Sequence, residues 1–267
     1  MTDDAHRQFL QTSGGRVEVC VELGYPVLRV SRPGYGGTDV GRLSPAQFAP
    51  LVDDVRAQLG IELFAAVVGT SFGGPQAIEY AGRHPGRTAA LVLHSAAPST
   101  LPYPDSAAQR LLGPVIFHPT LERHVWRSVA LMMRRAPRLG LGLMMGSLST
   151  QPVRSWLPDL AESDRASMRD VFASMRSGRG FVTDLSYAGT DHQQTRRSAQ
   201  QRVSCPALVT ASRQDGGVAW AHAEDFAATI PAARLVELPT PSHLFWIGPL
   251  RTDLLALIRD FLAPLTR

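Results

Sequence analysis

The sequence predicts an α/β fold, in which helices cover both faces of a mostly parallel sheet, with a helical insertion. Short apolar runs alternate with helical patterns before residue 98 and again after residue 202, an order typical of parallel sheets. Between them, residues 99–201 contain recurring prolines and helical patterns but no clear strand. We therefore expect residues 1–98 and 202–267 to form the two parts of one core, and residues 99–201 to form an inserted helical unit.

The first 40 residues predict three strands. Residues 8–11 and 16–21 flank Ser13-Gly14-Gly15, which indicates two strands joined by a tight turn. Residues 25–30 predict a third strand. It leads into residues 32–39, where three glycines and one proline predict an irregular loop.

Residues 44–59 carry the clearest helix signals of the chain. Ser44 is a typical N-cap, Pro45 fits the first turn, and Gln47 completes a capping box. Gly60 is placed to end the helix. Leu43 and Phe48 match a hydrophobic staple. One apolar stripe at helical spacing should pack against the sheet, and it consists of Phe48, Leu51, Val52, Val55 and Leu59.

A serine motif lies between a predicted strand and a predicted helix. The apolar run 64–68 ends in Gly69-Thr70-Ser71-Phe72-Gly73, and a helical pattern covers residues 75–84. In such a turn the serine adopts a strained backbone conformation above the sheet, and the glycines prevent collisions between neighbours. Because Gly-x-Ser-x-Gly is frequent by chance, a simple glycine-rich turn is the alternative interpretation.

The remaining elements continue the alternation. We predict strands at residues 89–93, 207–210 and 234–238, and helices at residues 121–135, 163–177, 220–230 and 254–262. In the second of these helices, methionines and other apolar residues share one face: Met168, Val171, Phe172 and Met175. Core packing is the favoured interpretation of this face, with an adaptable pocket wall as the alternative.

Three predicted strands are each followed by a residue with catalytic chemistry: Ser71, Asp215 and His243. Loops at the carboxyl ends of parallel strands gather at one edge of the sheet. A serine hydroxyl needs an adjacent base, and histidine has a suitable pKa. A carboxylate on the far ring nitrogen orients the imidazole and stabilises its charged form. For the other histidines considered, we expect surface or capping roles: His84, His94, His118, His124, His192 and His222.

Composition excludes several other classes of function. The net charge of +4 comes from arginines without any lysine, and no basic stripe with interleaved aromatics suggests nucleic-acid binding. No apolar run is long enough to span a membrane. Cys20 and Cys205 have no metal-type spacing, so we expect a reduced, cytoplasmic protein without a metal or cofactor.

The chain resembles the α/β-hydrolase family from about residue 23 to its end. The matching stretches are Arg32-Pro33-Gly34-Tyr35-Gly36, residues 69–74, Arg83-His84-Pro85, residues 211–216 and Ser242-His243. The resemblance implies a catalytic triad of Ser71, Asp215 and His243, and a lid at residues 99–201. It also implies that the Phe72 backbone N–H serves as one oxyanion donor.

One departure from the family pattern lies near residue 21. Residues 17–21 run almost directly into residues 23–25, so one central strand, its loop and the following helix are expected to be absent. Together these amount to about 25–30 residues. Either the strands ending near Val30 and Val68 pair directly, or the sheet is disturbed. The family's second oxyanion donor is then also absent. We expect amides of residues 34–37 or a water to replace it poorly, at a cost of about 10²–10³-fold in rate.

The leading functional prediction is a serine hydrolase acting on a small or medium ester or acyl substrate through an acyl-serine intermediate. The nucleophilic serine argues against the epoxide- and haloalkane-cleaving branches, whereas perhydrolysis and C–C bond hydrolysis stay open. Trp126, Trp156 and the lid methionines indicate a small-molecule substrate with an apolar portion. The alternative is a noncatalytic family member that binds a small ligand or a protein partner.

Overall fold

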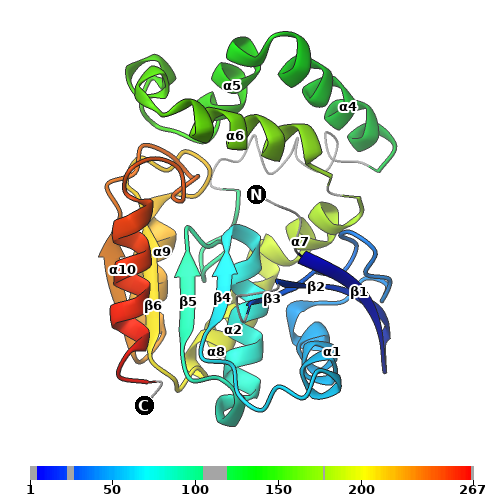
Figure 1. The fold of residues 1–267 in the computed structure, drawn as a ribbon. Helices are drawn as coiled ribbons and strands as arrows, with labels where there is room; N and C mark the ends of the chain where they lie inside the picture. Colours follow the sequence, from blue (N-terminus) through cyan, green and yellow to red (C-terminus); the bar gives the residue numbers. More distant parts are fainter. Residues whose placement is uncertain (1–4, 23–26, 105–118, 177, 266–267) are drawn as a thin grey trace.

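The computed structural model describes residues 5–22, 27–104, 119–176 and 178–265 (Figure 1). It contains an antiparallel three-stranded sheet in the order β1-β2-β3 and a parallel four-stranded sheet in the order β4-β5-β6-β7. The antiparallel strands are β1 (Ala5–Thr12), β2 (Gly15–Glu22) and β3 (Val27–Val30). The parallel strands are β4 (Val67–Thr70), β5 (Leu91–His94), β6 (Ala207–Ala211) and β7 (Ala233–Glu237). The predicted α/β class is confirmed.

The two sheets are not joined by strand pairing within the described residues. β3 pairs with β2, with Val19 opposite Val30, whereas β4 pairs in parallel with β5, with Val67 opposite Leu91. Val68 on the edge strand β4 is 56% exposed. Of the two arrangements considered above, the divided sheet is therefore the one adopted. Residues 23–26, next to the expected deletion, lie outside the described residues.

Helix α1 (Pro45–Gln58) begins as its sequence predicts. The Gln47 backbone N–H donates to Ser44 Oγ, and the Gln47 side chain accepts from the Ser44 backbone N–H, completing the capping box. Gly60 follows with φ 68°, a conformation that glycine adopts without strain. Most of the predicted stripe packs against β2: Phe48, Leu51 and Val55 are buried with Val17 and Val19.

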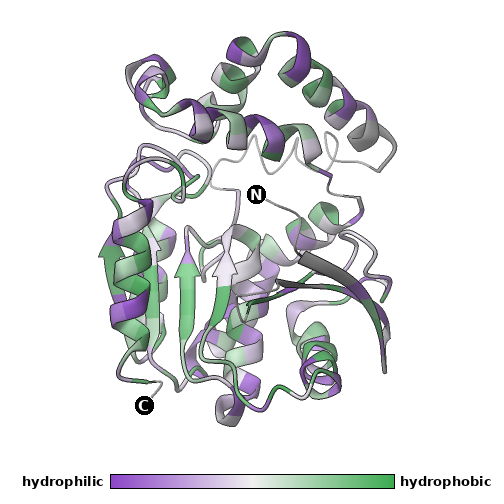
Figure 2. Ribbon diagram, viewed as in Figure 1, coloured by the Kyte–Doolittle hydropathy of each residue, from purple (hydrophilic) through white to green (hydrophobic). Residues whose placement is uncertain are grey.

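Four further helices belong to the core: α2 (Gly74–Arg83), α8 (Gln193–Gln201), α9 (Trp220–Thr229) and α10 (Arg251–Leu262). α2 contacts β4 and β5, while α9 contacts β6 and β7. Hydrophobic residues dominate β5 in Figure 2, and all four of its residues are buried. Leu91, Leu93 and Val209 form one core with Ile78 of α2 and Phe226 of α9. The sheet is thus held by burial of apolar strand faces under helices.

Five described helices lie in the stretch predicted as an insertion: α8, which packs with the core, and α4 (Pro119–Arg135), α5 (Pro137–Gly146), α6 (Glu162–Ser174) and α7 (Gly180–Ala188). α4, α5 and α6 lie beyond the carboxyl ends of β4 and β5 (Figure 1). They share an apolar cluster with Leu244 and Ile247, in which Met133, Met145 and Met168 are almost fully buried. Core packing therefore accounts for these methionines. Val171, by contrast, is 37% exposed, so its predicted place on the buried face of α6 is wrong.

Short 3₁₀ turns complete the described elements: η1 (Ser71–Gly73), η2 (Pro85–Arg87), η3 (Val153–Ser155), η4 (Leu157–Asp159) and η5 (Thr190–His192). The strand predicted at residues 64–68 begins later, because Phe64 forms only an isolated bridge with Thr88 before β4 starts at Val67. Among the described helices, none has the length and apolar character required to cross a bilayer.

Candidate active site

Ser71 stands at a sharp turn between β4 and α2. Its φ of 51° lies in the left-handed region, which is strained for a residue with a side chain. Thr70 before it is extended, and the 3₁₀ turn η1 leads directly into α2. The Ala97 N–H donates to the Ser71 carbonyl at 3.2 Å, which ties the turn to the loop after β5. The predicted strand-to-helix turn is therefore present, with the expected backbone strain at the serine.

Two of the three glycines around Ser71 are required by close packing. A Cβ on Gly69 would lie 2.8 Å from Gly74 Cα, and one on Gly74 would lie 2.9 Å from Ala96 Cβ. Gly73 differs: its φ is −72°, and a Cβ there would meet only Arg32 Nη1, at 3.9 Å. The expectation that the motif's flanking glycines prevent collisions thus holds for Gly69 and is wrong for Gly73.

Asp215 and His243 are brought together by the loops after β6 and β7. His243 Nδ1 lies 2.8 Å from Asp215 Oδ2, and the Asp215 side chain is fully buried. The backbone N–H groups of Gly217 and Val218 donate to Asp215 Oδ1 at 2.7 and 2.8 Å. These donors satisfy the buried carboxylate and fix its direction. When Nδ1 of His243 is protonated and donates a hydrogen bond to Asp215, Nε2 is unprotonated and can act as a base.

Ser71 is connected to this pair through packing. Among the described residues, no hydrogen bond joins Ser71 Oγ to His243. The Phe72 ring packs edge-on against Tyr103, with 5.0 Å between ring centroids, and the Tyr103 hydroxyl donates to the Gly217 carbonyl at 2.8 Å. A Cβ on Gly217 would lie 3.2 Å from His243 Cγ. A serine–histidine hydrogen bond that forms only with bound substrate is common in hydrolytic sites.

Leu148 and Ser149, between α5 and η3, connect the loop that carries Asp215 to the loop that carries His243. The Leu148 carbonyl accepts from the N–H groups of Gly216 (3.2 Å) and His243 (2.8 Å). Ser149 forms an isolated bridge with Asp215, and its Oγ donates to the Pro241 carbonyl at 2.6 Å. Sequence reasoning missed this segment because nothing in its own residues shows which distant loops it contacts.

Comparisons with known proteins agree with this architecture. A model of the alpha/beta hydrolase fold matches residues 15–248. The chain belongs to the alpha/beta hydrolase family. It is 30% identical over 244 residues to the uncharacterized hydrolase YcgS of Bacillus subtilis (strain 168), covering 91% of this chain and 84% of that protein.

Solved structures show the same fold at lower identity. An alpha/beta hydrolase fold protein from Nakamurella multipartita has a TM-score of 0.63 and 22% identity, covering 96% of this chain and 99% of that one. A thermophilic esterase from Thermogutta terrifontis also has a TM-score of 0.63, with 19% identity and coverages of 98% and 100%. At these identities the likeness establishes the fold of this hydrolase.

A second strained serine in this hydrolase is sealed from solvent. Ser95 follows β5 with φ 43°, but it is only 1% exposed, and its Oγ has no hydrogen-bond partner among the described residues. Ser71 is partly exposed. Exposure thus separates the two serines and favours Ser71 as the nucleophile.

His94 and His222 do not have the surface or capping roles expected for them. His94 is buried, with Nδ1 2.6 Å from Thr210 Oγ1 and its ring packed on Phe245. His222 is fully buried, and its Nδ1 lies 2.9 Å from Ser99 Oγ. Burial lowers the pKa of His94 to about 4, so its ring is neutral at physiological pH. Both histidines thus contribute to the core. His118 lies outside the described residues.

We expect His94 to make the fold sensitive to acid. Its folded pKa of about 4 lies below the ordinary value of 6.5, so between these values the unfolded chain binds a proton that the folded chain does not. Stability is unaffected above pH 6.5 and falls as the pH drops, by about 2 kcal/mol at pH 5. Urea unfolding at pH 7 and pH 5 measures this loss. His94→Gln should show a smaller loss, and an equal loss in both proteins would rule out this origin.

Arg32 belongs to a partly buried polar cluster beside the Ser71 turn that sequence reasoning did not assign. Its Nη2 donates to Asp184 Oδ2 at 2.7 Å, and the Tyr35 hydroxyl donates to the same oxygen at 2.7 Å. The guanidinium also lies over the Tyr35 ring, 4.4 Å from its centroid. Gly180, the first residue of α7, donates its N–H to the Gly34 carbonyl at 3.1 Å. The cluster and this bond tie α7 to the loop after β3. The sequence signals were the place of Arg32 after a predicted strand and its position, with Tyr35, in the stretch Arg32-Pro33-Gly34-Tyr35-Gly36 that matches the family.

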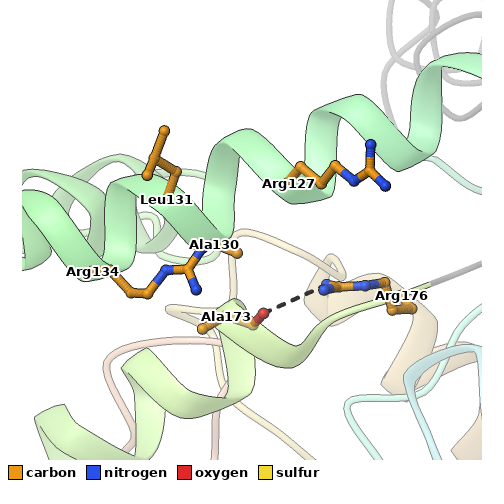
Figure 3. Close-up of a pocket in the computed structure, with 6 residues that line it drawn as sticks. All are labelled: Arg127, Ala130, Leu131, Arg134, Ala173 and Arg176. Atoms are coloured by element: carbon orange, nitrogen blue, oxygen red, sulfur yellow. Dashed lines mark hydrogen bonds between the residues drawn. The ribbon is translucent and has the colours of Figure 1, made fainter.

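One described cavity lies in the helical segment, away from the three candidate residues. It has a volume of about 440 Å³, lies between α4 and the end of α6, and is lined by Arg127, Ala130, Leu131, Arg134, Ala173 and Arg176 (Figure 3). Arg176 Nη1 contacts the Ala173 carbonyl at its rim. Trp156, expected near an apolar substrate, is instead 9% exposed within the methionine cluster.

Proposed function

We propose that this chain is a serine hydrolase that cleaves a small or medium ester, or a related acyl compound, through an acyl-Ser71 intermediate. The observation that carries the proposal is the 2.8 Å contact between His243 Nδ1 and Asp215 Oδ2. It lies at the sheet edge where Ser71 occupies its strained turn. The Thermogutta terrifontis protein of the same fold is described as an esterase, which supports an ester substrate, while perhydrolysis and C–C cleavage would use the same three residues.

In the proposed reaction Ser71 Oγ attacks the acyl carbonyl and its proton passes to His243 Nε2. Asp215 stabilises the resulting imidazolium, and the Phe72 N–H donates to the oxyanion. Collapse of the tetrahedral intermediate expels the alcohol, which takes the proton from His243. Water then repeats the sequence and releases the acid. We propose that residues 99–201 act as the lid over residues 1–98 and 202–267, and that the substrate has an apolar portion.

Labelling with a fluorophosphonate tests this proposal, because the probe reacts only with an activated serine. We expect the wild-type protein to be labelled and Ser71→Ala not to be labelled. Ser95→Ala is the matched control and should be labelled like the wild type, since Ser95 is buried. Absence of labelling in the wild-type protein would sink the proposal and favour the alternative, a noncatalytic member that binds a ligand or a partner. The observation that favours this alternative is the divided sheet, because the strand expected to be absent there is the one whose loop supplies the family's second oxyanion donor.

A further inference from the structure

The backbone of the loop after β3 offers fewer free donors than the sequence suggested. The N–H of Tyr35 donates to the Arg32 carbonyl at 3.0 Å, and the N–H of Gly37 donates to Glu18 Oε2. Both amides therefore already have acceptors. The proposed reaction still needs a second donor near the oxyanion, and a side chain is the natural alternative to an amide.

The Arg32 guanidinium has N–H donors without an acceptor in the part of the chain that the structure describes, and its Nη1 lies near Gly73 in the turn that carries Ser71. Among the described residues its Nη2 donates to Asp184, its face lies over the Tyr35 ring, and its Nε is buried without a hydrogen-bond partner, while the side chain as a whole is 25% exposed. Nη1 lies 3.9 Å from the point where a Cβ on Gly73 would stand. A guanidinium carries five N–H donors, and buried donors without partners are rare in folded proteins. This arrangement is typical of a group that awaits an anionic acceptor.

Gly73 gives a second, independent indication. Its backbone conformation suits any residue, and a Cβ there would meet nothing except Arg32 Nη1. Packing therefore does not explain a glycine at this place. A side chain at position 73 would extend into the space next to the guanidinium, two residues from Ser71. A glycine leaves the space beside Arg32 Nη1 free.

We propose that the Arg32 guanidinium is the second oxyanion donor of this hydrolase, acting together with the Phe72 N–H. The inference rests on the proposed function. As Ser71 Oγ bonds to the carbonyl carbon, the electron pair of the C=O bond moves to the oxygen, and Arg32 donates to that oxygen. The Ser71 proton meanwhile goes to His243. When the oxyanion re-forms the carbonyl, the C–O bond to the alcohol breaks and the alcohol leaves with the proton.

Asp184 and Tyr35 act as positioning residues for Arg32. Burial lowers the pKa of the guanidinium, but the charge of Asp184 and the Tyr35 hydroxyl outweigh burial, so this pKa is raised above its ordinary value. Burial, followed by the charge of Asp184, raises the pKa of Tyr35, so its hydroxyl stays protonated and donates a hydrogen bond to Asp184. The cation is thus held in one place by an ion pair, a hydrogen bond and an aromatic face.

The test compares variants in ester hydrolysis and in binding of a trifluoromethyl ketone, which forms a tetrahedral oxyanion adduct on an active serine. For Arg32→Gln we expect kcat to fall about 10²–10³-fold, with a much smaller change in KM, and ketone affinity to fall by a similar factor. Arg32→Lys keeps the positive charge but lacks the planar set of guanidinium donors, so its activity should lie between those of the wild type and Arg32→Gln. Asp184→Asn weakens the same ion pair while keeping the guanidinium, and it should lose thermal stability with a much smaller loss of kcat.

Three results would overturn the inference. One is an Arg32→Gln protein with kcat within about threefold of wild type, well short of the loss expected for one donor. Another is a ketone affinity of Arg32→Gln equal to that of the wild type. The third is an equal loss of kcat in Arg32→Gln and Asp184→Asn, which would indicate that the ion pair only stabilises the fold. If Arg32→Gln does not fold, a kcat and ketone affinity for Arg32→Lys equal to wild type decides against it. Fluorophosphonate labelling of wild type separates the two proposals: labelling with unchanged ketone affinity rejects only Arg32, and no labelling rejects both.

Discussion

Replacing His243 by alanine is expected to lower kcat for ester hydrolysis by about 10⁴–10⁶-fold, the loss typical of removing the base of a serine triad. Without the imidazole, no group near Ser71 takes the hydroxyl proton, and the alkoxide is inaccessible at neutral pH. His94 cannot substitute, because it is buried between Thr210 and Phe245. Turnover of a p-nitrophenyl ester measures the loss. His124→Ala removes an exposed histidine on α4 and should leave kcat unchanged.

The double variant Ser71→Ala/His243→Ala makes this prediction sharper. Because serine and histidine act as one unit, we expect the double variant to be no slower than either single variant. Losses that multiply would contradict a shared role for the two residues. The same holds for a His243→Ala protein that keeps more than about a tenth of wild-type kcat, since triad members cost far more than that when removed.

Asp215→Asn is expected to lower kcat by about 10⁴-fold while leaving the fold intact. The Asn oxygen can still accept from Gly217 and Val218, but its amide N–H₂ then faces His243 Nδ1. The imidazole must turn to the tautomer that carries its proton on Nε2, and this nitrogen can no longer accept a proton from Ser71. The substitution thus removes the base without removing the ring.

Kinetics and NMR together test this explanation. kcat should fall with little change in KM, and the Nδ1 proton resonance of His243 should disappear. Asp159→Asn, which neutralises an exposed carboxylate in η4, should change neither quantity. A loss of less than tenfold in Asp215→Asn would show that the 2.8 Å contact with His243 serves packing only.

Local signals were sufficient for elements that carry their own caps and periodicity. Ser44 and Gln47 form the predicted capping box, and the stripe from Phe48 to Val55 is buried as its spacing predicts. Helices α5, α7 and α8 were not predicted. α5 contains three glycines beyond its first turn, and α8 is strongly polar, so neither has a clear apolar stripe. Their stability comes from partners elsewhere in the chain, which is the usual way that tertiary packing overrides propensity.

The order of Ser71, Asp215 and His243, and the place of each one after a strand, follow from the chain alone. Parallel strands deliver their following loops to one edge, so this proximity follows from topology alone. The tight turn at Ser71 also follows from local sequence, because the close approach at Gly69 and the strained φ of Ser71 arise within a few consecutive residues.

The three-dimensional fold sets the surroundings of these residues, because the contacts join segments that are far apart in the chain. It divided the strands into two sheets, and it set Leu148 against the loops of Asp215 and His243. It also placed Arg32 between Asp184 and Gly73 of the Ser71 turn. Arg32 and Asp184 are 152 positions apart, and a hydrogen bond across that separation leaves no periodicity or composition in either segment. The strand ends thus follow from the sequence, whereas the donors around the nucleophile follow from packing between distant segments.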